Sequence, residues 1–152
     1  MARTDIASRL IEATPETIYA AMTDADALVQ WLPPGDMSGE MLEFDPAPGG
    51  HYRMKLRYRS RAIAGKSGDG ADIVLVRYLD LVPGALVSQA VDFVADDPAF
   101  VGTMAMHWIL EARPEGTLVT IRAENVPPGI AAEDHEAGLA ASLDNLARFT
   151  QI

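Results

Sequence analysis

The chain has 152 residues, of which 49% are hydrophobic, as in one ordinary globular domain. It has no cysteine, which excludes disulfides, cysteine-ligated zinc, iron–sulfur clusters and a cysteine nucleophile. The formal net charge of −10 disfavours nucleic acids and anionic membranes as partners, because both are bound by clustered Lys and Arg. No apolar run is long enough to span a membrane, and the first residues lack the apolar core of a signal peptide. We therefore expect a cytoplasmic protein without membrane insertion.

The first part of the chain predicts one strand and two short helices. Residues 4–12 form the expected strand. Thr14 is a favoured N-cap residue and Pro15 suits the first position of a helix. Asp24 can cap a second short helix, whose buried side includes Trp31. Both helices are therefore expected to pack on whatever sheet follows.

The middle of the chain has the two-residue hydrophobic period that is typical of strands. The segment Val82–Ala85 places Pro and Gly as a type II turn requires, and Arg113–Gly116 is a similar hairpin signal. Short connections between successive strands predict an antiparallel meander. The expected strands cover 39–44, 50–59, 71–82, 85–94, 101–112 and 117–125.

Residues 131–150 predict a long last helix. His135, Leu139 and Leu143 fall near one face at spacings of three and four residues. Gly138 costs about 1 kcal/mol in a helix interior. We therefore expect the helix to approach the sheet closely at this glycine.

This order of elements resembles the helix-grip fold of the START-like, or Bet v 1-like (SRPBCC), superfamily. More narrowly, the chain is similar to bacterial members of the Hsp90-ATPase-activator-homologue-like branch, which is often labelled polyketide cyclase-like. The resemblance is carried by Ile11–Tyr19 with Trp31, by Pro48–Gly50, by Leu79–Pro83 and by Asn125–Leu146. It implies one α+β domain over residues 1–152, in which an antiparallel sheet of about six or seven strands wraps around the last helix.

The resemblance also implies a cavity between the last helix and the sheet. Proteins that resemble this chain bind lipids, hormones, polyketides or no identified ligand. None of the quoted motifs is a catalytic signature, so no catalytic residue is carried over.

Strand parity predicts which side chains face that cavity. Met and aromatic side chains that face one space form an adaptable apolar wall, although the same residues could simply fill a core. Gln89 lies among them, and a buried amide needs hydrogen-bond partners. His135 could bond a ligand at the cavity mouth or the loop Asn125–Gly129. The expected ligand-binding residues are Trp31, Tyr52, Met54, Gln89, Met104, Met106, Trp108, His135, Leu139 and Leu143.

The positions of the other polar residues are less well defined by the sequence. Arg77 lies in a strand that is apolar on both faces, so parity leaves it either outside or inside, where it would need a carboxylate such as Asp92 or would bind an anion. Three histidines, His51, His107 and His135, lie on separate elements without paired ligand spacing, so neither a metal site nor a cofactor is expected. His107 has the outward parity.

A row of basic residues alternates along one strand and shares its outer face. The row is either a contact for an acidic partner or a solvated face that discourages aggregation. It consists of Arg53, Lys55, Arg57, Arg59 and Arg61.

Three functions are open at this point. We expect binding of a small hydrophobic or amphipathic molecule, and a homodimer is one possible assembly. The first alternative is a polyketide cyclase-like or hydrolase-like enzyme that uses Gln89, Arg77 and His135. The second is an Hsp90-activator-like interaction module that uses the basic row.

Overall fold

The computed structural model describes residues 3–33, 37–58, 71–93 and 102–151. The expected strands and helices are present, in the expected order, with small differences at their ends. The elements are β1 (Arg3–Ile11), α1 (Pro15–Met22), α2 (Ala25–Trp31), β2 (Met37–Phe44), β3 (His51–Tyr58), β4 (Ala71–Val82), β5 (Leu86–Phe93), β6 (Gly102–Arg113), β7 (Gly116–Val126) and α3 (Ala132–Thr150).

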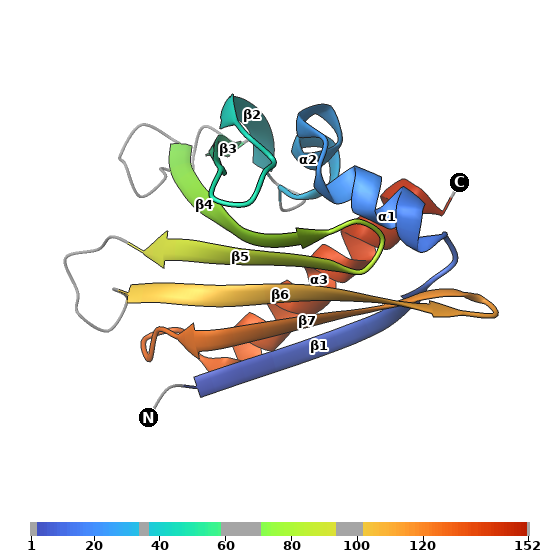
Figure 1. The fold of residues 1–152 in the computed structure, drawn as a ribbon. Helices are drawn as coiled ribbons and strands as arrows, with labels where there is room; N and C mark the ends of the chain where they lie inside the picture. Colours follow the sequence, from blue (N-terminus) through green and yellow to red (C-terminus); the bar gives the residue numbers. More distant parts are fainter. Residues whose placement is uncertain (1–2, 34–36, 59–70, 94–101, 152) are drawn as a thin grey trace.

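The strands form a 7-stranded antiparallel sheet in the order β1-β7-β6-β5-β4-β3-β2. The first strand of the chain therefore lies beside the last. One face of the sheet is covered by α3, and α1 and α2 pack at one end (Figure 1). This is the helix-grip fold that the sequence predicts.

The two short helices begin where the sequence predicts. The hydroxyl of Thr14 accepts a hydrogen bond from the backbone N–H of Thr17 at 3.2 Å, and Pro15 occupies the first helical position. The carboxylate of Asp24 accepts one from the N–H of Asp26 at 2.9 Å. Both caps satisfy backbone donors that the helix itself leaves unpaired.

The turn between β4 and β5 is also as predicted. Gly84 has a φ of +72°, the left-handed conformation that a type II turn needs at its third position. The N–H of Ala85 closes the turn by donating to the carbonyl oxygen of Val82 at 2.9 Å. The two strands therefore start in a fixed register.

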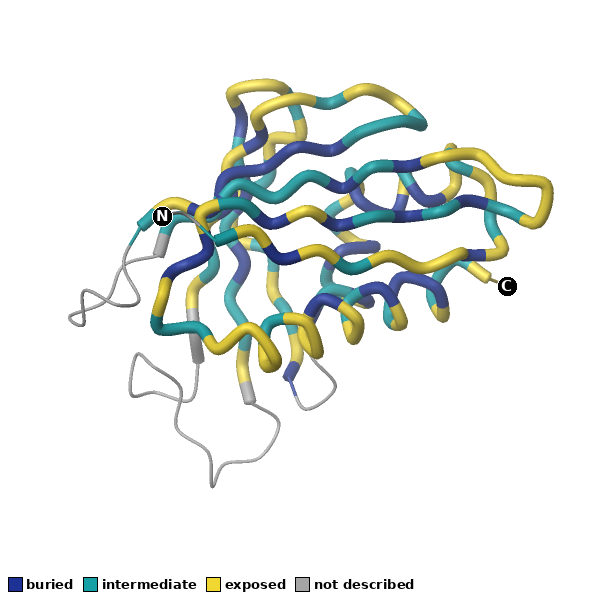
Figure 2. Tube along the Cα trace, turned by 90° about the horizontal axis from the view of Figure 1, so that it is seen from below, coloured by how far each residue is buried: buried dark blue, intermediate teal, exposed yellow. Residues whose placement is uncertain are grey.

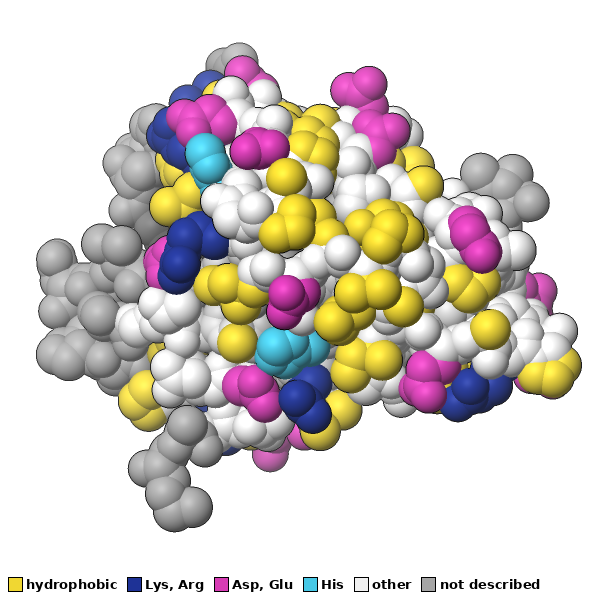
Figure 3. All heavy atoms as spheres, viewed as in Figure 1, with side chains coloured by type: hydrophobic (Ala, Val, Ile, Leu, Met, Phe, Trp, Pro, Cys, Tyr) yellow, Lys and Arg dark blue, Asp and Glu magenta, His cyan; other side chains and the backbone are white. Residues whose placement is uncertain are grey.

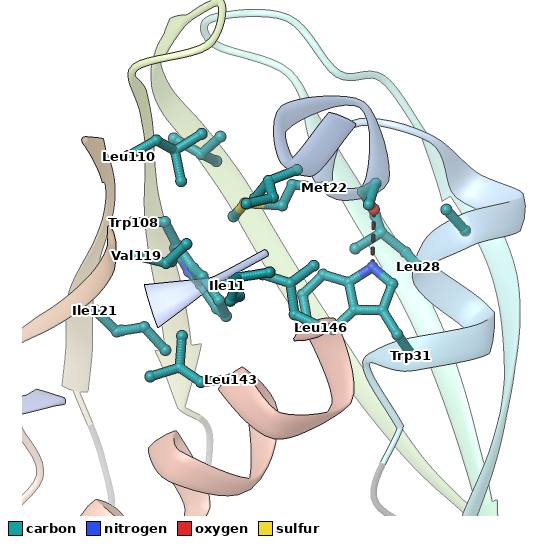
Figure 4. Packing of buried hydrophobic residues seen from close by; sticks show 14 of the residues in the cluster. Ile11, Met22, Leu28, Trp31, Trp108, Leu110, Val119, Ile121, Leu143 and Leu146 are labelled. Carbon is teal, nitrogen blue, oxygen red and sulfur yellow. Dashed lines mark hydrogen bonds between the residues drawn. The ribbon is translucent and has the colours of Figure 1, made fainter. Parts of the chain in front are cut away.

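The hydrophobic core lies between the sheet, α1, α2 and the second half of α3. From α3 it takes Leu139, Leu143, Leu146 and Ala147, all of which are buried. Figure 4 shows Leu143 and Leu146 facing side chains of the sheet and of α2. None of the helices in the described ranges is long and apolar enough to cross a membrane.

The first two turns of α3 pack less closely than the rest of the helix. Between residues 132 and 138 only His135 is partly buried, and the others are exposed (Figure 2). A Cβ atom added to Gly138 would meet nothing within 4 Å. The prediction that the helix approaches the sheet at Gly138 is wrong, because the buried side of α3 begins one residue later, at Leu139.

Candidate functional site

The inner face of the sheet, which faces α3, is the candidate site. Over β3 to β7 its described side chains are apolar or neutral, and none carries a charge. The polar groups among them are the hydroxyls of Tyr52, Tyr78 and Thr117, the amide of Gln89 and the indole N–H of Trp108, and the Thr117 hydroxyl donates to the carbonyl oxygen of Ala13. This face can therefore bind an apolar body and form a few hydrogen bonds, as ligand pockets commonly do.

All ten residues predicted to bind a ligand lie on this inner side or on the helices that cover it. Most of them share one core cluster, whereas Met104 belongs to a second, smaller cluster and Met106 packs against both. Gln89 is 7% exposed and pairs in register with Tyr78 on one side and Met106 on the other. The cluster members are Trp31, Tyr52, Met54, Trp108, Leu139 and Leu143.

Two tryptophans close one end of the inner face. The ring centroids of Trp31 and Trp108 lie 5.8 Å apart, with the rings nearly perpendicular. The indole N–H of Trp31 donates to the carbonyl oxygen of Ala21 at 2.8 Å (Figure 4). This edge-to-face contact joins β6 to α2.

Two buried donors on the inner face have no partner among the described residues. They are the indole N–H of Trp108 and the hydroxyl of Tyr78, whose residues are 4% and 1% exposed. A buried polar group without a partner costs about 1–3 kcal/mol. Each of the two groups would therefore be stabilised by a hydrogen-bond acceptor, which the described residues do not provide.

The phenols of the inner face stay protonated at neutral pH. Burial raises the pKa of Tyr52 and of Tyr78 well above the ordinary value, and it also raises the pKa of Tyr19 on α1. The rings of Tyr52 and Tyr78 lie 5.9 Å apart. The hydroxyl of Tyr78 is therefore available as a donor.

Part of the inner face is open. Leu56, Val74, Val91 and Met106 have the inward parity of their strands, yet each is only partly buried. We call these four residues the open row. Val74 is a residue that sequence reasoning missed, because β4 carries apolar residues on both faces: Ile73 and Leu75 beside it are exposed. No periodic signal in that strand distinguishes its two faces.

His135 holds the start of α3 to the edge of the sheet. Its Nδ1 lies 2.7 Å from a carboxylate oxygen of Asp5 on β1, and the guanidinium of Arg3 donates to the same carboxylate at 3.1 and 3.2 Å. Burial raises the pKa of Asp5, but the hydrogen bonds from His135 and Arg3 outweigh it and leave that pKa below its ordinary value. The expected contact of His135 with the loop Asn125–Gly129 is replaced by this bond to β1.

Arg77 lies on the outer face of the sheet. Its guanidinium donates to both carboxylate oxygens of Asp92 at 2.9 and 3.1 Å, and the hydroxyl of Thr103 donates to Asp92 as well. The hydrogen bond from Arg77 is the main reason why the pKa of Asp92 is lowered. Of the two positions that the sequence left open, the structure therefore has the outward one, with Asp92 as the partner.

The basic row lies partly outside the described residues, which do not include Arg59 and Arg61. Arg53 donates to Glu43 at 2.7 Å, and His51 lies 2.7 Å from the same carboxylate. Arg53 is thus part of a local ion pair.

Hydrophobic side chains gather over the middle of this outer face, and charged side chains lie between and around them (Figure 3).

A serine, a histidine and a glutamate form a hydrogen-bonded chain on the outer face. The hydroxyl of Ser88 lies 2.8 Å from Nδ1 of His107, and Nε2 of His107 lies 2.9 Å from Glu124. Sequence reasoning placed His107 outward, as found, but missed this group, which only the register of β5, β6 and β7 brings together. Ser88 is 2% exposed and its strand is paired on both sides, so its hydroxyl is not presented to a substrate.

Two grooves formed by described residues lie outside the inner face. One, of about 520 Å³, lies between α1, α2 and the end of α3, and the other, of about 260 Å³, lies between β1 and α3. Both are open to solvent, and neither is lined by Trp108, Gln89 or the open row. The first is lined by Thr17, Ala20, Ala21, Asp24, Ala27, Phe149 and Thr150, and the second by Ser8, Arg9, Ala140, Leu143 and Asp144.

The model of one protein family, described as Activator of Hsp90 ATPase homolog 1-like protein, matches residues 12–151. The chain belongs to this family. The match covers all three helices and every strand except β1, so it confirms the predicted resemblance. A comparison of this chain with curated proteins finds no match.

Solved structures show the same fold. A crystal structure of a protein from Chromobacterium violaceum is 30% identical, with a TM-score of 0.83, and the alignment covers 98% of this chain and 97% of that one. The solution structure of the AHSA1-like protein from Aeromonas hydrophila is 17% identical, with a TM-score of 0.77, covering 98% and 92%. A crystal structure from Mesorhizobium loti is 20% identical, with a TM-score of 0.76, covering 98% and 97%.

Proposed function

We propose that the protein binds a small hydrophobic or amphipathic molecule against the inner face of the sheet, over the open row. The observation that carries this proposal is the partial exposure of four apolar side chains on the inner face of the sheet. A ligand that covers them removes apolar surface from water, which is worth roughly 25 cal/mol for each Å². Met106 adds adaptability, because a Met side chain repacks easily around different shapes.

The neighbouring helix supports the same location. The first two turns of α3 contribute one partly buried side chain, His135, and the rest of that segment is exposed. This part of the helix is held mainly by a polar contact to β1 and not by apolar packing. Local opening takes little free energy where few apolar contacts are broken, so a ligand can pass beneath such a segment.

A cyclase-like or hydrolase-like enzyme is less well supported. Of its three candidate groups, Arg77 is paired with Asp92 on the outer face and His135 with Asp5. Gln89 is on the inner face, but an amide does not titrate and so cannot act as a general acid or base. The Hsp90-activator-like alternative relied on the basic row, where Arg53 is bonded to Glu43.

Met106→Glu tests the proposal, because it places a charge in the open row. Leu75→Glu is the matched control: it introduces the same charge at an exposed site on the outer face of β4, two strands away from β6. Binding of the fluorescent apolar probe anilinonaphthalene sulfonate is titrated for each protein, after circular dichroism has shown that all three are folded. We expect the control to bind like the wild type and Met106→Glu to bind at least about tenfold more weakly.

The natural ligand is sought with the same pair of variants. Each is produced in the protein's own host, and native mass spectrometry measures any bound mass before extraction and identification. The wild type and Leu75→Glu should carry the same adduct, and Met106→Glu should lose it. Equal probe binding and equal adducts in both variants, or no binding by the wild type, would rule out the open row as a ligand site.

A further inference from the structure

The polar groups of the inner face narrow the chemistry of its ligand. On β3 to β7 the described inward side chains include no Lys, Arg, Asp, Glu or His. A charged ligand group placed there would lose its water without gaining a counter-ion, which is strongly unfavourable. We therefore expect the ligand's polar part to be uncharged where it meets these described side chains.

The charged side chains that link β1 to α3 are already paired. Asp5 on β1 bonds both Arg3 and His135, and Arg9 on the same strand is paired with Asp144 of α3. These pairs join β1 to α3 at the edge of the sheet. They are engaged in holding the helix, so they do not offer an anionic or cationic ligand a free partner.

Trp108 and Tyr78 are both hydrogen-bond donors, so the uncharged polar group of the ligand should be an acceptor. The indole N–H can only donate, and its described surroundings give it no acceptor. The hydroxyl of Tyr78 is also buried without a partner, and burial raises its pKa, so it keeps its proton and can donate. Trp31 shows the contrast, because its indole N–H is satisfied by the carbonyl oxygen of Ala21.

The two donors adjoin the open row. Tyr78 on β4 pairs with Gln89 on β5, and Gln89 pairs with Met106 on β6. Trp108 follows Met106 at the next inward position of β6. An apolar body that lies on Met106 therefore brings its polar end towards the donors on either side of β5.

We propose that the ligand carries an uncharged hydrogen-bond acceptor, such as the carbonyl oxygen of a ketone, ester or amide, which is bound by the indole N–H of Trp108 and the hydroxyl of Tyr78. The inference rests on the proposed function, since it specifies the ligand of the same site. It separates neutral carbonyl compounds from hydrocarbons, which lack the acceptor, and from carboxylates, which carry a charge.

Three probes of nearly the same shape test the inference: acetophenone, ethylbenzene and benzoate. Ethylbenzene replaces the carbonyl by a methylene group, and benzoate replaces the acetyl group by a carboxylate. Each is titrated by amide and indole N–H NMR. The protein has 2 tryptophans, so its spectrum contains an indole signal for each, and Trp31→Phe assigns them.

We expect acetophenone and ethylbenzene to bind, and benzoate to bind at least about tenfold more weakly than acetophenone. Acetophenone should shift the indole N–H signal of Trp108 downfield, whereas the signal of Trp31, already hydrogen-bonded, should stay in place. Tyr78→Phe removes only the hydroxyl. This variant should bind acetophenone about fivefold more weakly than the wild type does and should bind ethylbenzene with unchanged affinity. Thr120→Val, which removes a hydroxyl from the outer face of β7, is the control.

The outcomes separate the two proposals. If acetophenone and ethylbenzene bind but Tyr78→Phe weakens both equally, or the Trp108 signal does not respond to the carbonyl, the donors are satisfied by water and the inference is wrong while the binding function stands. If benzoate binds as well as acetophenone, the uncharged character is refuted. If neither neutral probe shifts any inner-face signal, the binding function itself fails.

Discussion

The hydrogen bond between Asp5 and His135 leads to a prediction about how the start of α3 is held. Asp5→Asn keeps the shape of the side chain, but removes its charge and replaces one acceptor oxygen by a donor. The carboxylate accepts bonds from Arg3 at 3.1 and 3.2 Å and lies 2.7 Å from Nδ1 of His135. Hydrogen bonds that involve a charged group contribute about 1.5–3 kcal/mol. Since one acceptor oxygen remains, we expect Asp5→Asn to lower the free energy of unfolding by about 2 kcal/mol.

A second pair between the same two elements provides the control. Arg9 of β1 and Asp144 of α3 also form an ion pair, but their side chains are 40% and 54% exposed. Exposed pairs contribute about 0.2–1 kcal/mol, so Asp144→Asn should cost less than about 1 kcal/mol. For a domain of this size, the loss in Asp5→Asn corresponds to a fall in Tm of about 4–8 °C.

Hydrogen exchange locates the effect, and acid titration tests its cause. In Asp5→Asn the amides of residues 132–138 should lose protection more than those of 139–150, because His135 alone is partly buried in the first segment. The pKa of Asp5 is lower in the folded state than in the unfolded state. The stability that the ionised carboxylate contributes is therefore fully present above the unfolded pKa of about 3.9, and it is lost as the pH falls through the folded pKa. Asp5→Asn should lack this part of the pH dependence. Equal destabilisation by Asp5→Asn and Asp144→Asn, with uniform exchange, would refute the reasoning.

Three backbone predictions follow from local geometry and are checked by urea unfolding. Gly138→Ala should stabilise the protein by up to about 1 kcal/mol, because the added Cβ meets nothing within 4 Å in an exposed part of α3; a loss of stability would show an unseen contact. Gly116→Ala should cost more than about 1 kcal/mol, since φ is +151° and the new Cβ would lie 2.1 Å from the carbonyl oxygen of Ile11; neutral behaviour would contradict this backbone conformation. Thr14→Ala removes the acceptor for the N–H of Thr17 and should cost about 1 kcal/mol, and Thr14→Ser, which keeps that acceptor, should recover most of it.

Local sequence signals predict the parts of the fold that depend on local geometry. The cap at Thr14 and the glycine at the third position of the Val82–Ala85 turn are as expected, because each depends on a few neighbouring residues. The alternation along β6 places Trp108 inside and His107 outside, because only one face of that strand is strongly apolar. These predictions need no knowledge of distant parts of the chain.

Residues whose environment depends on distant elements are not predictable in this way. His135 bonds Asp5, 130 positions away, and no local pattern shows that β1 lies under the start of α3. Gly138 looks like a packing glycine in the sequence, yet it is exposed. The open row shows the same limit: parity identifies inward residues, but only the three-dimensional arrangement of α3 decides which of them stay partly open to solvent.

The position of β1 beside β7 has a consequence for biosynthesis. The hydroxyl of Thr117 at the start of β7 donates to the carbonyl oxygen of Ala13, 104 positions earlier. At roughly 5–20 residues per second, β1 leaves the ribosome about 5–20 s before its pairing strand is complete. During that interval Ile6, Leu10 and Ile11 lack the neighbour that they have in the native sheet. Non-local pairing of this kind is slow to form, so a nascent chain that ends before β7 is the form of this protein most exposed to aggregation and to proteases.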